Sequence, residues 1–259
     1  AFYEGDIAAA MVAAITDAAG NPGVMTVADL AAYKAKDRAA VCRPYRQWRV
    51  CGMGPPSSGG VTTLGILGLL EQFDLAALTP GSVEAIHLIS EASRLSYADR
   101  ARYLADSDFV AVPVRGLLDR GYLADRAALI DPATSMGTAA AGTPPHDDGM
   151  LWADDPGTEQ ISTTHLSVID GLGNAVSMTS SVESAFGSRL MVGGFMLNNQ
   201  LTDFSFRPAV DGVAVANRVA PGKRPRSSMA PTLVFGQDGE LLLAVGSPGG
   251  SRIIGYVTQ

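Results

Sequence analysis

Apolar residues recur at helical spacing through the first half of the chain. Residues 7–19 form an alanine-rich run that stops at Gly20, and the Asn-Pro-Gly that follows is typical of a helix end. Residues 82–106 carry apolar side chains at helical spacing, and residues 61–73 are almost continuously apolar. The pattern therefore predicts an N-terminal helix, a buried helix over 61–73 and a long amphipathic helix over 82–106.

Two short motifs mark further boundaries in this half. Thr26-Val27-Ala28-Asp29 fits a capping box, in which the first and fourth residues satisfy each other's backbone N–H groups. This motif predicts a helix that starts after residue 26. Residues 55–60 read Pro-Pro-Ser-Ser-Gly-Gly, which predicts a tight loop before the buried helix.

The pattern changes twice in the second half. Residues 132–162 are dominated by Ala, Gly, Thr, Pro and Asp without periodicity, which is typical of an exposed, flexible linker. The next residues predict a hairpin, because apolar and β-branched positions at 165–169 and 175–178 flank a turn at 170–174. Residues 241–245 predict one more strand.

Composition narrows the class of protein. The chain has 259 residues, of which 47% are hydrophobic and 17% charged, as in ordinary globular proteins. The formal net charge of −7 argues against a nucleic-acid partner, because phosphates need a basic surface. The apolar run at 61–70 is too short and too interrupted to span a membrane. Neither end resembles a natural terminus, so we expect an internal piece of a longer protein.

Cys42 and Cys51 flank a short run that a hairpin could fold back on itself. A disulfide between them would favour an exported protein. The plainer alternative is two small apolar residues on neighbouring strands, and the sequence alone slightly favours that alternative.

Thr163 and Thr164 open the predicted hairpin directly after the predicted linker. A threonine hydroxyl is a weak nucleophile without a base, and a free α-amine on the same residue can supply one because its pKa lies near neutral. Such an amine requires Thr163 to begin a chain. Attack of its own hydroxyl on the Ser162 carbonyl, followed by hydrolysis of the ester, would produce that state. By itself the Thr-Thr pair favours a mere strand start.

Two loops add candidate chemistry. Residues 246–252 read Gly-Ser-Pro-Gly-Gly-Ser-Arg, and adjacent glycines allow backbone N–H groups to converge on an oxyanion, although a plain turn is commoner. Residues 223–229 place two serines beside basic residues and could hold a carboxylate or form a solvated loop. His87, His146 and His165 are scattered, so we expect no metal site, and we expect His165 to be a strand residue rather than a catalytic base.

Taken together, these blocks resemble the gamma-glutamyltransferase (gamma-glutamyltranspeptidase) family of N-terminal nucleophile hydrolases. In the second half the resemblance rests on Thr-Thr-His-Leu-Ser-Val-Ile-Asp at 163–170, Leu-Asn-Asn-Gln-Leu-Thr-Asp-Phe-Ser at 197–205, Lys-Arg-Pro-Arg-Ser-Ser-Met-Ala-Pro-Thr at 223–232 and the glycine block at 246–252. In the first half it rests on Asp-Leu-Ala-Ala-Tyr at 29–33, Pro-Pro-Ser-Ser-Gly-Gly at 55–60 and Tyr-Ala-Asp-Arg at 97–100.

The resemblance implies an α+β fold, an αββα four-layer sandwich, built from two subunits that self-cleavage produces. Residues 1–162 would form the C-terminal part of the large subunit, with 133–162 as a flexible linker before the cut, and 163–259 the N-terminal part of the small catalytic subunit. The implied partners are a glutathione-like gamma-glutamyl donor and an amino-acid, peptide or water acceptor, with no cofactor. Family habit implies the periplasm or secretion.

The resemblance also implies a role for individual residues. Thr163 matches the nucleophile that takes the gamma-glutamyl group as an acyl-enzyme, and Ser181 stands where a second threonine hydrogen-bonds that nucleophile. Gly249 and Gly250 match the backbone of the oxyanion hole. The residues implied to hold the donor's α-amine are Gln200 and Asp203, and those implied to hold its α-carboxylate are Ser227 and Ser228.

Three departures leave the substrate open. Glu183 stands where well-known members have an asparagine beside the donor's α-amine, and a carboxylate can still accept from an ammonium. Residues 206–222 are short for the lid loop of several bacterial members, and the family's carboxylate-pairing arginine would lie upstream of Ala1. The alternatives are a glutaryl-type cephalosporin acylase, a poly-gamma-glutamate-processing enzyme and an uncleaved, non-catalytic paralogue.

Overall fold

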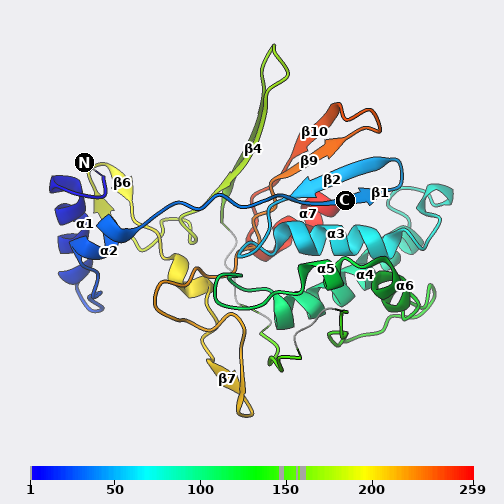
Figure 1. The fold of residues 1–259 in the computed structure, drawn as a ribbon, viewed down its shortest axis with the longest axis horizontal. Coiled ribbons are helices and arrows are strands. Elements are labelled where there is room, and N and C mark those ends of the chain that lie inside the picture. Colours follow the sequence, from blue (N-terminus) through cyan, green and yellow to red (C-terminus); the bar gives the residue numbers. More distant parts are fainter. Residues whose placement is uncertain (1, 146–148, 156, 158–161) are drawn as a thin grey trace.

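A helical layer lies against a four-stranded antiparallel sheet, and smaller hairpins extend from this body (Figure 1). The computed structural model describes residues 2–145, 149–155, 157 and 162–259. The α-helices are α1 (Asp6–Thr16), α2 (Val27–Ala32), α3 (Gly59–Leu70), α4 (Val83–Tyr103), α5 (Val114–Leu117), α6 (Arg120–Ala127) and α7 (Ile253–Thr258), and the 3-10 helices are η1 (Leu75–Ala77), η2 (Gln200–Asp203) and η3 (Gly250–Arg252). The expected α+β class is confirmed.

The main sheet combines strands from distant parts of the sequence. Its order is β1-β2-β9-β10, so the first two strands come from before residue 162 and the last two from after it. The strands are β1 (Val41–Tyr45), β2 (Trp48–Gly52), β3 (Thr164–Ile169), β4 (Ala175–Ser180), β5 (Met191–Val192), β6 (Phe195–Met196), β7 (Ala209–Val210), β8 (Val213–Ala214), β9 (Thr232–Phe235) and β10 (Leu241–Val245). The predicted strand at 241–245 is β10.

The two cysteines form a disulfide between β1 and β2. They face each other in the antiparallel register, Cys42 opposite Cys51, with their Cα atoms 4.0 Å apart. The slight preference for unpaired cysteines was therefore wrong. Spacing alone could not show that the turn places both residues at one register position.

Helix α3 lies at the centre of the helical layer. It contacts α4, α6 and α7 on its flanks and β1 and β2 on the sheet. The helix begins at Gly59, so the two glycines of the predicted loop form its first turn instead. An ideal Cβ on Gly59 would lie 2.3 Å from the Met229 carbonyl oxygen, and one on Gly60 would lie 2.4 Å from that of Met53. Only glycine permits this close approach.

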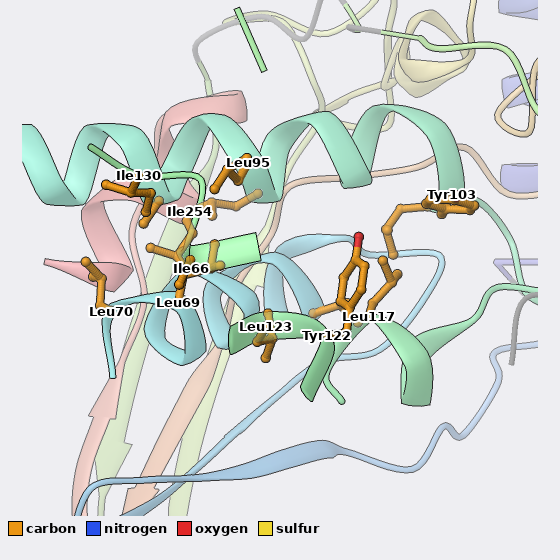
Figure 2. Packing of buried hydrophobic residues seen from close by; sticks show 14 of the residues in the cluster. Ile66, Leu69, Leu70, Leu95, Tyr103, Leu117, Tyr122, Leu123, Ile130 and Ile254 are labelled. Atoms are coloured by element: carbon orange, nitrogen blue, oxygen red, sulfur yellow. The ribbon is translucent and has the colours of Figure 1, made fainter. Parts of the chain in front are cut away.

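The hydrophobic core fills the space between α3 and the other helices (Figure 2). Ile66 and Leu69 of α3 meet Leu95 of α4, while Leu123 of α6 and Ile254 of α7 close the sides. All five side chains are buried. The near-continuous apolar pattern of 61–73 is explained by this central position, because neighbours contact α3 from several directions.

The other predicted helices are present with shifted ends. Helix α4 spans Val83–Tyr103 and is capped by Ser82, close to the predicted 82–106. The first helix ends at Thr16 rather than at residue 19. The capping box before α2 is confirmed, since the Asp29 carboxylate accepts from Thr26 N at 2.8 Å and Asp29 N donates to Thr26 Oγ1 at 3.3 Å.

Parts of the segment expected to be an exposed linker contact the core, among the described residues 133–145 and 149–155. Buried carboxylates of α4 hold its backbone: Met136 N donates to Glu91 Oε2 at 2.8 Å, and Gly142 N donates to Asp99 Oδ1 at 2.8 Å. Trp152 is also buried. Most of the described residues are exposed, as expected, but side chains of a distant helix hold the backbone at residues 136 and 142. The subunit boundary after Ser162 stays a prediction, and His146 lies outside the described residues.

The predicted hairpin is β3–β4. Its register pairs Thr164 with Ser180 and Ile169 with Ala175, and the turn between them is the predicted one. Figure 1 shows β4 extending well beyond the main sheet. The middle of the hairpin contacts that sheet, since Ser177 Oγ donates to the Val245 carbonyl at 3.0 Å and accepts from Thr232 N at 3.1 Å.

Candidate active site

One small cavity gathers nearly all the candidate residues. Its lining consists of Ser162, Thr163, Ser181, Glu183, Gln200, Asp203, Ser227, Ser228, Met229, Gly250 and Ile253. Of the site residues that the family resemblance implied, only Gly249 is missing from this lining. None of the described lining residues comes from 206–222, the stretch that we expected to be short for a lid.

Thr163 and Ser181 lie side by side at the base of the β3–β4 hairpin. Because Thr164 pairs with Ser180, the next residue on each strand occupies the adjoining position. Thr163 has a φ of 141°, which is rare for a β-branched residue. Such a conformation costs on the order of 1–3 kcal/mol. The bond between Ser162 and Thr163 therefore precedes a strained residue that faces the cavity.

An acidic corner occupies one part of the cavity. Glu183 is 4% exposed, and its Oε2 accepts from Ser184 Oγ at 3.0 Å. Its backbone N–H donates to Ser181 Oγ at 2.9 Å. Gln200 and Asp203 are the first and last residues of η2, and the Gln200 amide donates to the Asp203 carboxylate. Two buried carboxylates in one cavity suit a ligand that carries an ammonium group.

Serine hydroxyls form another part of the lining, and the residues of the Pro-Pro-Ser-Ser-Gly-Gly loop hold them in place. Ser58 N and Ser58 Oγ both donate to the Ser227 carbonyl, at 2.8 and 2.7 Å. Ser57 Oγ donates to the Met229 carbonyl at 2.5 Å. Ser228 is 3% exposed and lies between these anchored residues. The loop before α3 thus fixes the backbone on both sides of Ser228.

The glycine block forms a turn between β10 and α7. Gly249 and Gly250 have φ values of 136° and 57°, which side chains rarely adopt. An ideal Cβ on Gly249 would also lie 2.9 Å from the Tyr256 ring. Gly250 lines the cavity and Gly249 adjoins it. The backbone of this turn is therefore free of side chains beside Thr163, as an oxyanion site requires.

His165 is a strand residue, as expected. It lies in β3, where its Nδ1 is 2.8 Å from Thr179 Oγ1, and burial lowers the pKa of its ring. Its imidazole occupies the space beside Gly246, where an ideal Cβ would lie 2.1 Å from the ring. It is not among the residues that line the cavity. Within the described ranges, no group of three or more His, Cys, Asp or Glu could hold a metal ion.

Two apolar residues of the lining, and one residue that contacts Ser228, were not predicted from the sequence. Met229 and Ile253 line the cavity beside the predicted serines and glycines. Arg100 contacts Ser228 from behind, although the matched Tyr-Ala-Asp-Arg block had no role assigned. Adjacency to a predicted site residue was a usable signal for Met229 and Ile253. No local pattern could have indicated that α4 reaches residue 228.

The arrangement combines groups that suit acyl transfer to a threonine. A hydroxyl faces the cavity beside a side-chain-free turn, with carboxylates in one part of the lining and serine hydroxyls in another. A zwitterionic, amino-acid-like group would match the carboxylates and the hydroxyls. No helix in the described part of the chain has both the length and the apolar character for crossing a membrane.

Comparisons with known proteins identify the family of the chain. The family model described as Gamma-glutamyltranspeptidase matches residues 1–259. The chain is 40% identical over 268 residues to the "Glutathione hydrolase proenzyme" of Escherichia coli K12, covering all of this chain and 43% of that relative. It is 36% identical over 249 residues to the "Acylase ACY 1 proenzyme" of Pseudomonas sp. SE83, covering 95% of this chain and 41% of that relative.

Solved structures show the same fold. A cephalosporin acylase from Bacillus halodurans superposes with a TM-score of 0.81 at 26% identity, covering all of this chain and 42% of that one. The gamma-glutamyltranspeptidase of Helicobacter pylori superposes with a TM-score of 0.54 at 36% identity, over 58% of this chain and 43% of that one. The chain spans less than half the length of each of these relatives.

Proposed function

The chain belongs to the gamma-glutamyltranspeptidase family, and we propose on that basis that its cavity transfers or hydrolyses gamma-glutamyl groups through Thr163. The observation that carries the proposal is the convergence of the candidate residues. Positions spread from residue 162 to residue 250, chosen from sequence alone, line one cavity. A non-catalytic paralogue would have no need for these candidate residues to line the same cavity.

Self-cleavage is the first step of the proposed mechanism. The Thr163 hydroxyl attacks the Ser162 carbonyl carbon, the C–N bond breaks, and the carbonyl becomes an ester on Thr163. Water then hydrolyses the ester, which leaves a carboxylate on Ser162 and a free α-amine on Thr163. The positive φ of Thr163 supports this step, because cleavage frees the residue from its strained conformation.

Acyl transfer follows at the new N-terminus. The α-amine of Thr163 accepts the proton of its own hydroxyl, and the oxygen attacks the γ-carbonyl of the donor. Backbone N–H groups of Gly249 and Gly250 would stabilise the oxyanion, and Ser181 would orient the nucleophile. The donor's amine leaves with a proton, and water or an amine acceptor then takes the gamma-glutamyl group from Thr163.

The polar lining supports a gamma-glutamyl donor. Glu183, Gln200 and Asp203 would hold the α-ammonium of the donor, and Ser227 and Ser228 would donate to its α-carboxylate. Glutathione and other gamma-glutamyl amides carry both groups. The acceptor would be an amino acid, a peptide or water.

A related acylase is the second candidate. The similarity to a cephalosporin acylase, with a TM-score of 0.81, supports it. Glu183 separates the two candidates, because a glutaryl donor has no ammonium for the carboxylate to bind. We expect the full-length protein to cleave gamma-glutamyl anilide faster than glutaryl anilide. The reverse preference would contradict the gamma-glutamyl assignment.

Mass spectrometry under denaturing conditions tests the nucleophile. We expect the full-length wild-type precursor to yield two fragments divided between Ser162 and Thr163. Thr163→Ala should yield one intact chain, because it removes the attacking hydroxyl. Thr164→Ala is the matched control and should still be cleaved. An intact wild-type chain would support an uncleaved, non-catalytic paralogue instead.

We also propose an exported location for the protein. The disulfide between Cys42 and Cys51 supports it, because such bonds persist in oxidising compartments. Fractionation of the native cells, followed by detection of the protein in the periplasm or medium, tests this location. Recovery in the cytoplasm with reduced cysteines would contradict it.

A further inference from the structure

A buried amide lies behind the cavity and connects two parts of its lining. Asn217 is 1% exposed and is not among the residues that line the cavity. Its Nδ2 donates to the Asp203 carbonyl at 2.8 Å, and its Oδ1 accepts from Arg226 N at 3.0 Å. Asp203 is the last residue of η2, and Arg226 directly precedes Ser227. One side chain therefore joins the acidic corner to the serine loop (residues 226–228).

The two backbone partners require a side chain that has both a donor and an acceptor. A backbone carbonyl only accepts and a backbone N–H only donates, so the two partners also fix which end of the Asn217 amide carries the oxygen. A carboxylate of the same shape has no donor. It would also lie beside the Asp155 carboxylate, which accepts from the same Nδ2 at 3.3 Å. An asparagine therefore suits this position, and an aspartate does not.

The backbone around Asn217 is held on both sides. The Asn217 carbonyl accepts from Ser205 N at 3.0 Å, so the chain just after η2 is bonded to residue 217 a second time. The buried Lys223 ammonium donates to the carbonyls of Ala216 and Arg218, the residues before and after Asn217. The amide therefore connects the acidic corner and the serine loop from a fixed position.

A ligand with two charged groups on one carbon needs both parts of the cavity at a fixed separation. In the proposed function the acidic corner binds the α-ammonium of the donor and the serine loop binds its α-carboxylate. Both groups are attached to the same α-carbon, so they are bound at once only if the two parts lie at the matching separation. At another separation either group could still be bound alone.

We propose that Asn217 is a positioning residue that holds the acidic corner and the serine loop at the separation that an α-amino acid requires. It acts through the backbone at Asp203 and Arg226 and does not touch the substrate. Asn217 thereby favours donors that carry both an α-ammonium and an α-carboxylate. This inference rests on the proposed function, because it assigns a specificity-determining role beside the same cavity.

The test uses four anilides with the full-length protein. Gamma-glutamyl anilide carries both charged groups, 4-aminobutanoyl anilide lacks the carboxylate, glutaryl anilide lacks the ammonium, and butanoyl anilide lacks both. The coupling factor is the product of kcat/KM for the first and last donors divided by the product for the other two. It exceeds one when the site recognises the two groups better together than separately. We expect Asn217→Ala to lower this factor about tenfold, because the buried hydrogen bonds that join the two parts are lost.

A second variant and a control accompany this test. In Asn217→Ser the shorter hydroxyl cannot reach both backbone partners, so the factor should fall in the same direction by less. This variant keeps a polar group at the buried position and serves as the test if Asn217→Ala fails to fold. Asn174→Ala is the matched control, because Asn174 is an exposed asparagine in the turn of the β3–β4 hairpin. It should leave the factor unchanged.

Each outcome has one meaning. A wild-type protein that cleaves gamma-glutamyl anilide while Asn217→Ala keeps the wild-type factor overturns the role of Asn217 and leaves the proposed function standing. Equal losses for all four donors leave the factor unchanged and overturn the role in the same way, because a merely structural role affects the donors alike. A factor near one in the wild type also overturns it. A wild-type protein that cleaves none of the anilides overturns the proposed function, and this inference falls with it.

Discussion

In the proposed function, Glu183 would determine which donors the site accepts, because its carboxylate is buried and lines the cavity. We expect Glu183→Gln to lower kcat/KM for gamma-glutamyl anilide about tenfold, since a charge-assisted hydrogen bond is replaced by a neutral one. The rate with glutaryl anilide should stay the same or rise. Steady-state kinetics with both anilides measure the effect.

The control for that change is Glu240→Gln. Glu240 is an exposed residue before β10, so its substitution should leave both rates near wild type. A loss for the glutaryl compound as large as that for the gamma-glutamyl compound would contradict the role of Glu183.

Lys223 titrates at an unusual pH for a lysine. It is 8% exposed, donates to the Ala216 and Arg218 carbonyls, and burial together with the Arg218 charge lowers its pKa to about 8. The unfolded chain holds this proton up to a pH near 10.5. Between these two values the folded protein binds fewer protons than the unfolded chain, so stability rises with pH.

We therefore expect the free energy of unfolding of the wild type to gain about 2 kcal/mol over Lys223→Met as pH rises from 8 to 10. Urea unfolding at several pH values measures the difference. Lys34→Met, at an exposed lysine, should show no such trend. A pH-independent gap between wild type and Lys223→Met would contradict the lowered pKa.

At the scale of elements, the β1–β2 hairpin depends on its disulfide. The bond closes a short loop, with Cys42 and Cys51 nine positions apart, for which the entropy lost by the unfolded chain predicts a contribution of about 2.5 kcal/mol. Replacing both cysteines with alanine should lower the free energy of unfolding by that amount. Dithiothreitol should lower it equally in the wild type and leave the variant unaffected. Equal stability of wild type and variant would contradict the prediction.

Periodicity was sufficient for elements whose pattern is contained in their own residues. The α4 helix and the β3–β4 hairpin were predicted because their residues follow the period of a helix or of a strand. The contacts of residues 136 and 142 were not predicted, because they are made with Glu91 and Asp99 on a helix some 40 residues away in sequence. Buried hydrogen bonds between distant segments leave no local pattern.

At the scale of the whole molecule, Asp155 joins the two halves of the chain. The Arg226 guanidinium donates to its carboxylate at 3.2 Å, Asn217 donates to the same oxygen at 3.3 Å, and both Asp155 and Arg226 are buried. Asp155→Ala would leave a buried guanidinium without this carboxylate. We expect a loss of about 3 kcal/mol in the free energy of unfolding.

The neighbouring Asp154→Ala is a matched control. Asp154 pairs with Arg102 at the surface, with 52% of its side chain exposed, and such pairs contribute less than about 1 kcal/mol. Chemical denaturation of both variants gives the comparison. Similar losses in the two would show that the buried pair is not the stabilising contact.

The site itself could be assembled from sequence only through family resemblance. The spacing of residues alone predicted only that Thr163 begins a strand. It did not predict that Ser181, Gln200 and Ser228 line the same cavity. The chain brings them together because η2, the hairpin base and the serine loop all end at one cavity. Arg100 remained invisible for the same reason, since its contact with residue 228 depends on how α4 lies against the sheet.

The sheet order β1-β2-β9-β10 has a consequence for how the protein refolds. Strands β2 and β9 are hydrogen-bonded neighbours, yet they lie on opposite sides of the bond between Ser162 and Thr163. Before cleavage their pairing is a first-order event within one chain. After the proposed cleavage it would be a second-order encounter whose rate depends on concentration. The mature protein would then persist because it unfolds slowly, and a denatured sample would recover better from undiluted than from dilute solution.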